Sequence, residues 1–74
     1  MLPEYIIRMQ EELAQLNDRL SKAINFLNQE QINPSKLNET QKAYLDEQID
    51  IMQMYAKILS KRIQYECLNH EIGE

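Results

Sequence analysis

The chain has 74 residues and a formal net charge of −4, with 12 acidic residues against 8 lysines and arginines. A domain this short buries only roughly 60% of the surface that its unfolded chain exposes, so a monomer is marginal without a disulfide, a metal, oligomerisation or very regular helix packing. One cysteine and one histidine allow neither an internal disulfide nor a Cys/His zinc cluster. The acidic charge disfavours DNA, RNA and anionic membranes as partners. Helix packing and oligomerisation remain, and we expect no metal and no cofactor.

The N-terminal segment carries no pattern for export or membrane insertion. It reads MLPEYIIRMQ, without a basic stretch followed by a long apolar run. Elsewhere no apolar stretch approaches the roughly 20 residues of a membrane span. We therefore expect a cytoplasmic protein.

The first predicted helix runs from about residue 3 to about residue 28. Pro3 suits the first helical position, where its missing N–H costs nothing, and no glycine or proline follows before Pro34. Apolar residues recur at alternating spacings of three and four, which is typical of a helix that packs along one partner. These residues are Ile6, Met9, Leu13, Leu16, Leu20, Ala23 and Leu27. Further apolar residues, at Ile7, Ile24 and Phe26, lie off this stripe and widen the apolar surface.

A loop over about residues 29–37 separates this helix from a second one. Asn33-Pro34-Ser35 is a turn signature. Asn38 with Gln41 three residues later predicts an N-cap with a capping-box partner, so the second helix runs from about residue 38 to about residue 68. Its stripe consists of Leu45, Ile49, Met52, Ala56, Leu59 and Ile63. We call the two stripes together the hairpin seam, and they predict an all-α, antiparallel two-helix hairpin as a single domain over residues 1–74.

The second helix has a further apolar row, offset from the hairpin seam by about 100°. Its members stand seven residues apart and are Tyr44, Ile51, Ile58 and Tyr65. One partner helix cannot cover both surfaces, and soluble monomers rarely expose so continuous an apolar strip. We therefore predict that this row is a subunit interface of a homo-oligomer, and the sequence leaves the number of subunits open.

Catalytic residues are not evident. Cys67 and His70 stand three apart and meet on one helical face, but no third residue is placed to orient the imidazole. The Glu-x-x-His spacing of carboxylate metal sites in helical bundles is absent. We interpret Cys67 as an ordinary thiol and His70 as a surface histidine, and we expect no enzyme activity.

The basic residues fall into a pattern that suits an anionic ligand. On the first helix, three basic residues lie within about 60° of one another, with Gln15 between them, and they are Arg8, Arg19 and Lys22. On the second helix, a seven-residue row flanks the seam and consists of Gln48, Tyr55 and Arg62. Arg makes bidentate contacts to phosphate, Tyr can stack on a base, and Gln can hydrogen-bond to a base edge. These six residues are therefore candidates for a nucleotide pocket. The alternative is a solvated face with ion pairs to acids such as Asp18 and Glu66.

The same residues resemble a family of small phage proteins. The first helix contains Leu16-Asn17-Asp18-Arg19-Leu20-Ser21-Lys22 and then Phe26-Leu27, and the second contains Leu45-Asp46-Glu47-Gln48, Met52, Tyr55, Ile58-Leu59 and Arg62-Ile63. This set resembles hairpin proteins of the crAss-phage type, which are similar to the hairpin domain of anti-CBASS and anti-Thoeris sponge proteins. The resemblance extends from about Tyr5 to Ile63.

The resemblance implies a homo-oligomer, often of six subunits, that binds cyclic nucleotide messengers between subunits without cleaving them. The host's immune effector then loses its signal, and the protein would act in the host cytoplasm. The messenger would be a cyclic dinucleotide, a cyclic trinucleotide or a cyclic ADP-ribose isomer. Gln48, Tyr55 and Arg62 match the family's second-helix motif, and Arg19 matches its first-helix motif. The chain is shorter than many such proteins and lacks their additional segments.

A different class of function is also open. The row Tyr44, Ile51, Ile58 and Tyr65 suits docking on a host or phage protein, either to block it or to assemble a particle. A stable monomer or dimer with that row exposed favours this second hypothesis. The host pathway does not follow from the sequence under either one.

Overall fold

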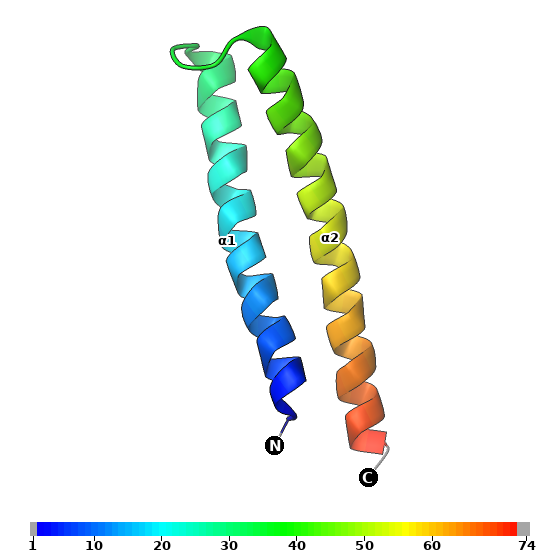
Figure 1. Ribbon diagram of the computed structural model, residues 1–74. Coiled ribbons are helices and arrows are strands. Elements are labelled where there is room, and N and C mark those ends of the chain that lie inside the picture. The colour runs from blue at the N-terminus through cyan, green and yellow to red at the C-terminus, as the bar shows by residue number, and fades with distance from the viewer. Residues whose placement is uncertain (1, 73–74) are drawn as a thin grey trace.

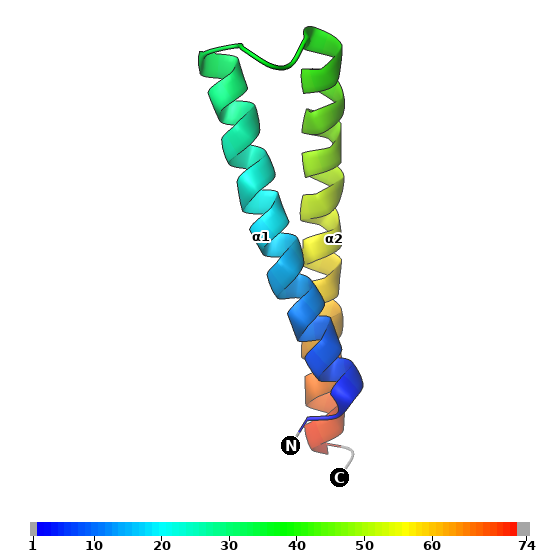
Figure 2. The same cartoon turned by 60° about the vertical axis from the view of Figure 1, so that its left-hand side comes forward.

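The computed structural model describes residues 2–72, with only the backbone of residues 71 and 72. Two α-helices make up the described fold, α1 over Glu4–Ile32 and α2 over Glu39–Ile72. They lie side by side and antiparallel, joined by a loop at one end, with both termini at the other end (Figures 1 and 2). The molecule measures 55 × 16 × 15 Å. The predicted all-α two-helix fold is confirmed.

The apolar core lies along the line where the two helices meet. Its buried members are Ile6, Leu16, Leu27, Ile49 and Leu59. All the other members of the hairpin seam are half-buried, so every residue that the spacing placed on the seam is at least partly withdrawn from water. Because these residues recur at spacings of three and four on both helices, they face one partner along the whole length of the hairpin.

The loop is shorter than the sequence predicts. α1 continues to Ile32, one turn beyond the expected end near residue 28, because Asn28 to Ile32 contains no helix breaker. The helix ends at Asn33, whose N–H still donates to the Gln29 carbonyl oxygen at 2.8 Å, since Pro34 disfavours helix for the residue before it. At the other end α2 continues to Ile72 rather than to about residue 68, and residues 73 and 74 lie outside the described part.

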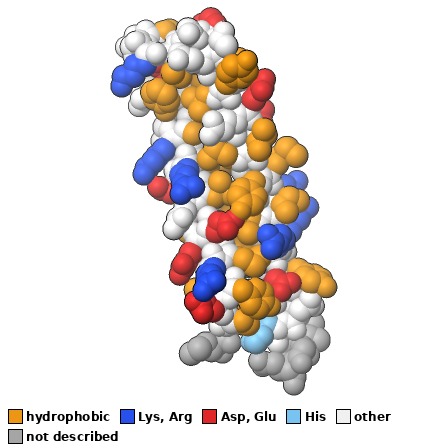
Figure 3. All heavy atoms as spheres, viewed as in Figure 1, with side chains coloured by type: hydrophobic (Ala, Val, Ile, Leu, Met, Phe, Trp, Pro, Cys, Tyr) orange, Lys and Arg blue, Asp and Glu red, His pale blue; other side chains and the backbone are white. Residues whose placement is uncertain are grey.

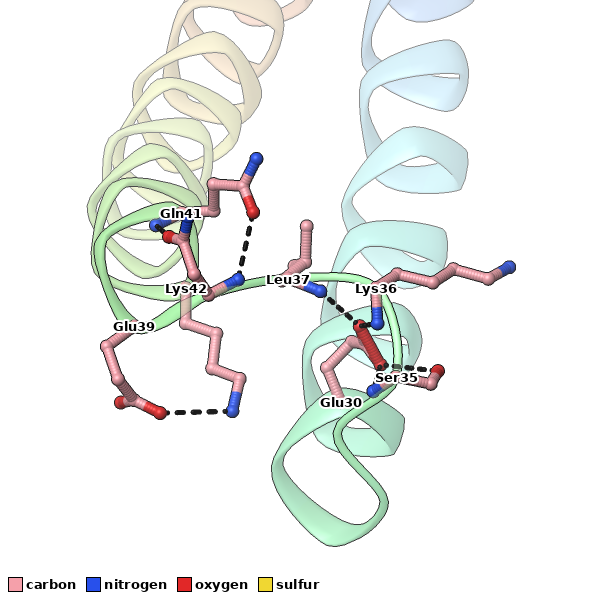
Figure 4. A network of polar contacts seen from close by, with 8 residues as sticks. Glu30, Ser35, Lys36, Leu37, Glu39, Gln41 and Lys42 are labelled. Carbon is pink, nitrogen blue, oxygen red and sulfur yellow. Dashed lines mark hydrogen bonds and ion pairs between the residues drawn. The ribbon is translucent and has the colours of Figure 1, made fainter.

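A buried carboxylate fixes the loop. Glu30 is only 3% exposed, and its carboxylate accepts hydrogen bonds from the Lys36 N–H at 2.7 Å and the Leu37 N–H at 2.8 Å. The Ser35 N–H and Ser35 hydroxyl donate to its other oxygen, each at 3.2 Å (Figure 4). Burial by itself raises the pKa of Glu30, but these hydrogen bonds together hold the pKa below its ordinary value. The loop backbone is thereby tied to the last turn of α1.

The start of α2 confirms the predicted capping box. The Gln41 N–H donates to Asn38 Oδ1 at 2.8 Å, and the Asn38 N–H donates back to Gln41 Oε1 at 2.9 Å. Figure 4 shows Gln41 at the first turn of α2, beside the ion pair between Lys42 and Glu39. Two backbone donors that the helix leaves unpaired are satisfied in this way. Among the described helices, neither is long and apolar enough to cross a lipid bilayer.

Candidate ligand-binding groove

One face of α2 remains uncovered within the hairpin. Its large apolar side chains are well exposed, namely Tyr44 at 67%, Ile51 at 66%, Ile58 at 53% and Tyr65 at 64%. These are the residues predicted as a subunit interface. Figure 3 shows hydrophobic side chains running along the hairpin on the face it displays, with Lys and Arg side chains at intervals beside them. A single hairpin leaves this surface in water, and the row's exposure is consistent with an interface that needs a partner.

The exposed apolar row and the predicted ligand-binding row of α2 are parts of one surface. Taken together they alternate at spacings of four and three, in the order Tyr44, Gln48, Ile51, Tyr55, Ile58, Arg62 and Tyr65. We call these seven exposed residues the outer seam. Its spacing is that of a second helix-packing stripe, and two of its positions are polar. The residues that the sequence predicts as an interface row and as a ligand-binding row therefore lie on one surface of α2.

A groove lies at the end of the hairpin that carries the two termini. It has a volume of about 470 Å³. α1 contributes Tyr5 and Met9, and α2 contributes Ile58, Lys61, Arg62, Tyr65 and Glu66. We call it the terminal groove. Two phenol rings, two apolar side chains, two cations and one carboxylate thus line a small concave surface.

Tyr5 and Glu66 connect the two helices across this groove. The Tyr5 hydroxyl donates to Glu66 Oε1 at 2.9 Å, over a separation of 61 residues in the chain. The hydrogen bond to Glu66 raises the pKa of Tyr5, and burial and the Glu66 charge act in the same direction. The phenol therefore stays protonated and remains a donor at neutral pH.

The two groove cations form no ion pair within residues 2–72. Among the described side chains the ion pairs are those of Arg8, Lys22 and Lys42, so Lys61 and Arg62 share this state with the remaining lysines and arginines. With Glu66 the groove side chains carry a formal charge of +1, on a chain whose net charge is −4. A local positive site on an acidic protein is what a specific anionic ligand requires.

The six predicted ligand-binding residues do not gather at one place within a single hairpin. Only Arg62 lines the terminal groove. Gln48 and Tyr55 lie farther along the outer seam, and Arg19 is exposed on α1. Because Tyr5 lies opposite Glu66 and the helices are antiparallel, Arg19 stands level with residue 52, between Gln48 and Tyr55.

Two of the six predicted ligand-binding residues instead form exposed ion pairs on their own helix, as the alternative interpretation of a solvated face expects. Arg8 pairs with Glu4, and Lys22 pairs with Asp18 at 3.0 Å, in both cases with exposed partners four residues away. Such pairs contribute little and leave both cations available to a stronger ligand. Glu66, which the sequence suggested as an ion-pair partner, instead accepts the Tyr5 hydrogen bond.

Sequence reasoning predicted only Arg62 of the groove residues as a ligand contact. It assigned Ile58 and Tyr65 to the subunit interface and Met9 to the hairpin seam, and it gave Tyr5, Lys61 and Glu66 no place in a ligand site. The missing information was the register of the two helices, because the sequence does not say which residue of α1 lies opposite Arg62. One signal was available: Tyr5 and Met9 stand four apart on the edge of the α1 stripe, and Arg62 and Glu66 stand four apart on α2.

The fold and groove define a class of protein: a two-helix hairpin with a buried hairpin seam, an exposed outer seam and a small groove lined by cationic and aromatic side chains. A family model described as Sequestin matches residues 3–65, which includes the loop, most of both helices and the groove up to Tyr65. The chain belongs to the Sequestin family. Searches among curated proteins and among solved structures find no significant match.

Proposed function

We propose that this protein binds and sequesters a cyclic nucleotide messenger in the terminal groove without cleaving it. The family name suggests the sequestration of a ligand, and the groove offers the chemistry for this class of ligand. The observation that carries the proposal is the pair Lys61 and Arg62, free of ion pairs within the described hairpin and flanked by Tyr5 and Tyr65. Arg and Lys bind phosphate, and tyrosine rings stack on bases.

The size of the groove agrees with such a ligand. Its volume of about 470 Å³ lies within the range of roughly 300 to 1,000 Å³ that is usual for small-molecule sites. Sequestration needs affinity and abundance rather than a reaction, so it requires no catalytic arrangement in the groove. In a phage-encoded protein, removal of the messenger would silence a host immune effector of the CBASS or Thoeris type.

A second copy of the chain is the partner that we propose for the outer seam. The seam reads Tyr-Gln-Ile-Tyr-Ile-Arg-Tyr, which is the same in both directions except that Gln48 exchanges with Arg62. A two-fold axis near Tyr55 would therefore bring like residues together and place Gln48 of one copy at Arg62 of the other. Such a self-complementary surface is what a two-fold interface uses.

This pairing would also complete the ligand site. The amide oxygen of Gln48 can accept from the Arg62 guanidinium, and its N–H₂ group can donate to a ligand beside it. The predicted residues Gln48 and Arg62, which lie apart within one hairpin, would then meet between two copies. Six subunits, as the resemblance to sponge proteins implies, would be built from three such pairs.

The test is a thermal-shift screen of the purified protein with cyclic dinucleotides, cyclic trinucleotides and cyclic ADP-ribose isomers, together with its mass in solution. A ligand at a hundredfold its dissociation constant stabilises the fold by about 2.7 kcal/mol. We expect a shift with at least one messenger, and the messenger should be recovered intact after heating. Cleaved messenger would point to an enzyme, and no shift across the panel would refute the proposal.

Arg62→Ala tests the assigned groove. We expect this variant to lose the messenger-induced shift, because Arg62 supplies the bidentate phosphate contact. Lys57→Ala is the matched control, since Lys57 is an exposed cation on α2 that lies on neither the outer seam nor the terminal groove. Equal shifts for Arg62→Ala and the wild type would remove Arg62 from the site.

The exposed outer seam also favours a second candidate function, a module that docks on a different protein. Its apolar row is long enough to serve a foreign helix as well as a second copy. A stable monomer that shifts with no messenger would favour this candidate.

A further inference from the structure

Glu66 is a carboxylate inside a groove whose other charged groups are cations. It lines the groove together with Tyr5, and its Oε1 accepts the Tyr5 hydroxyl at 2.9 Å. The Sequestin match ends at residue 65, so Glu66 stands one residue beyond it. A ligand of uniform negative charge would be repelled by this side chain. A ligand that reaches this side chain would therefore have to bring hydrogen-bond donors to it.

The charged side chains of the groove offer two kinds of contact. Lys61 and Arg62 attract phosphate oxygens, whereas the Glu66 carboxylate accepts hydrogen bonds and repels phosphate. The phenol rings of Tyr5 and Tyr65 lie in the same groove and offer faces on which a flat ring can stack. A nucleotide would therefore place its phosphate at the two cations and its base beside the carboxylate.

The four common bases differ in what they would present to Glu66. The Watson–Crick edge of guanine carries two adjacent donors, N1–H and the N2 amino group, which match the two oxygens of a carboxylate. Adenine and cytosine place an acceptor nitrogen next to their amino group, and uracil flanks one N–H with two carbonyl oxygens. Proteins that read a single base combine such edge contacts with aromatic stacking. A carboxylate at this place discriminates in favour of guanine.

We infer that the terminal groove prefers a guanine-containing cyclic nucleotide, with Glu66 as the residue that selects the base, Tyr5 and Tyr65 as its stacking partners, and Lys61 with Arg62 as its phosphate contacts. This inference rests on the proposed function and specifies its ligand. The Tyr5 hydrogen bond is a positioning contact that fixes the carboxylate in the groove.

The test compares cyclic di-GMP with cyclic di-AMP, which carry the same charge and differ only in their bases, by titration calorimetry on the full chain. We expect the wild type to bind cyclic di-GMP roughly tenfold or more tightly, the discrimination typical of a bidentate base contact. Glu66→Gln keeps an oxygen for the Tyr5 hydroxyl but removes the negative charge. We expect this variant to bind cyclic di-GMP more weakly and cyclic di-AMP as well as before or more tightly.

The opposite directions of these two changes separate selection from a structural role. Glu47→Gln, an exposed α2 residue outside the groove, is the control and should leave both affinities unchanged. Equal affinity of the wild type for both ligands overturns the inference and leaves the proposed function standing. A parallel loss of both affinities in Glu66→Gln also overturns it, because Glu66 then only supports Tyr5. Binding of neither ligand, together with an unresponsive messenger panel, refutes the proposed function itself.

Discussion

Ile51→Ala measures whether the outer seam is covered in solution. In a single hairpin Ile51 is 66% exposed, so its truncation should change the stability by no more than about 0.5 kcal/mol. If a second copy covers the outer seam, about two-thirds of the Ile51 side chain becomes newly buried in the pair. Truncation to Ala removes three carbons, each stabilising by about 0.8 kcal/mol when buried, so each subunit loses about 1.6 kcal/mol of association free energy. A two-fold pair then loses about 3 kcal/mol, or roughly two-hundredfold in its association constant.

The assay combines light scattering with thermal unfolding at two protein concentrations. We expect wild-type unfolding to depend on concentration, and Ile51→Ala to lower both the mass and the unfolding temperature. Leu59→Ala is the control, because Leu59 is 1% exposed within the hairpin and its truncation costs about 2–5 kcal/mol in any state of assembly. An Ile51→Ala protein with wild-type mass and stability at every concentration would refute the reasoning about the outer seam.

Two further predictions concern single side chains. Gln48→Glu should strengthen self-association, because it offers a carboxylate to Arg62 of a second copy, and it should weaken binding of an anionic messenger. Light scattering measures the first effect and calorimetry the second. An unchanged mass in solution would contradict the proposed pairing. Glu30 has a lowered pKa in the fold, so its contribution to stability is complete above its ordinary pKa of 4.5 and is lost as the pH falls through its folded-state pKa. Thermal unfolding between pH 7 and pH 3 should show a shallower acid loss in Glu30→Gln, and identical slopes would exclude Glu30 as the titrating group.

The features of the fold that follow the helix period or involve only neighbouring residues were predictable from the sequence. The spacing of apolar residues identified every member of the hairpin seam, because burial along a helix pair follows its period. Asn38 and Gln41 identified the start of α2, because their side chains bond only to the backbone next to them. Local signals of this kind need no knowledge of the partner helix.

Features that depend on register or on burial were not predictable in the same way. Glu30 lies in the segment expected to be loop, and nothing in the sequence distinguishes its buried carboxylate from the many exposed ones. The Tyr5–Glu66 contact requires the relative shift of the two helices, which equal stripes of Leu and Ile do not define. For the same reason the terminal groove was not predictable from the sequence, although one of its cations, Arg62, was predicted as a ligand contact.

The position of the loop has a consequence for what sets the width of the groove. The loop, tied down by Glu30, joins the helices at one end of a molecule 55 Å long, and the groove lies at the opposite end (Figure 1). The loop therefore does not hold the two helices together at the groove, and no covalent link is near. There, side-chain packing and the Tyr5–Glu66 hydrogen bond set the width. Ile6, next to Tyr5, is fully buried, so separating the helices at this end would expose it to water. The width of the groove is thus coupled to the burial of Ile6, and a ligand that forced the helices apart would bind more weakly.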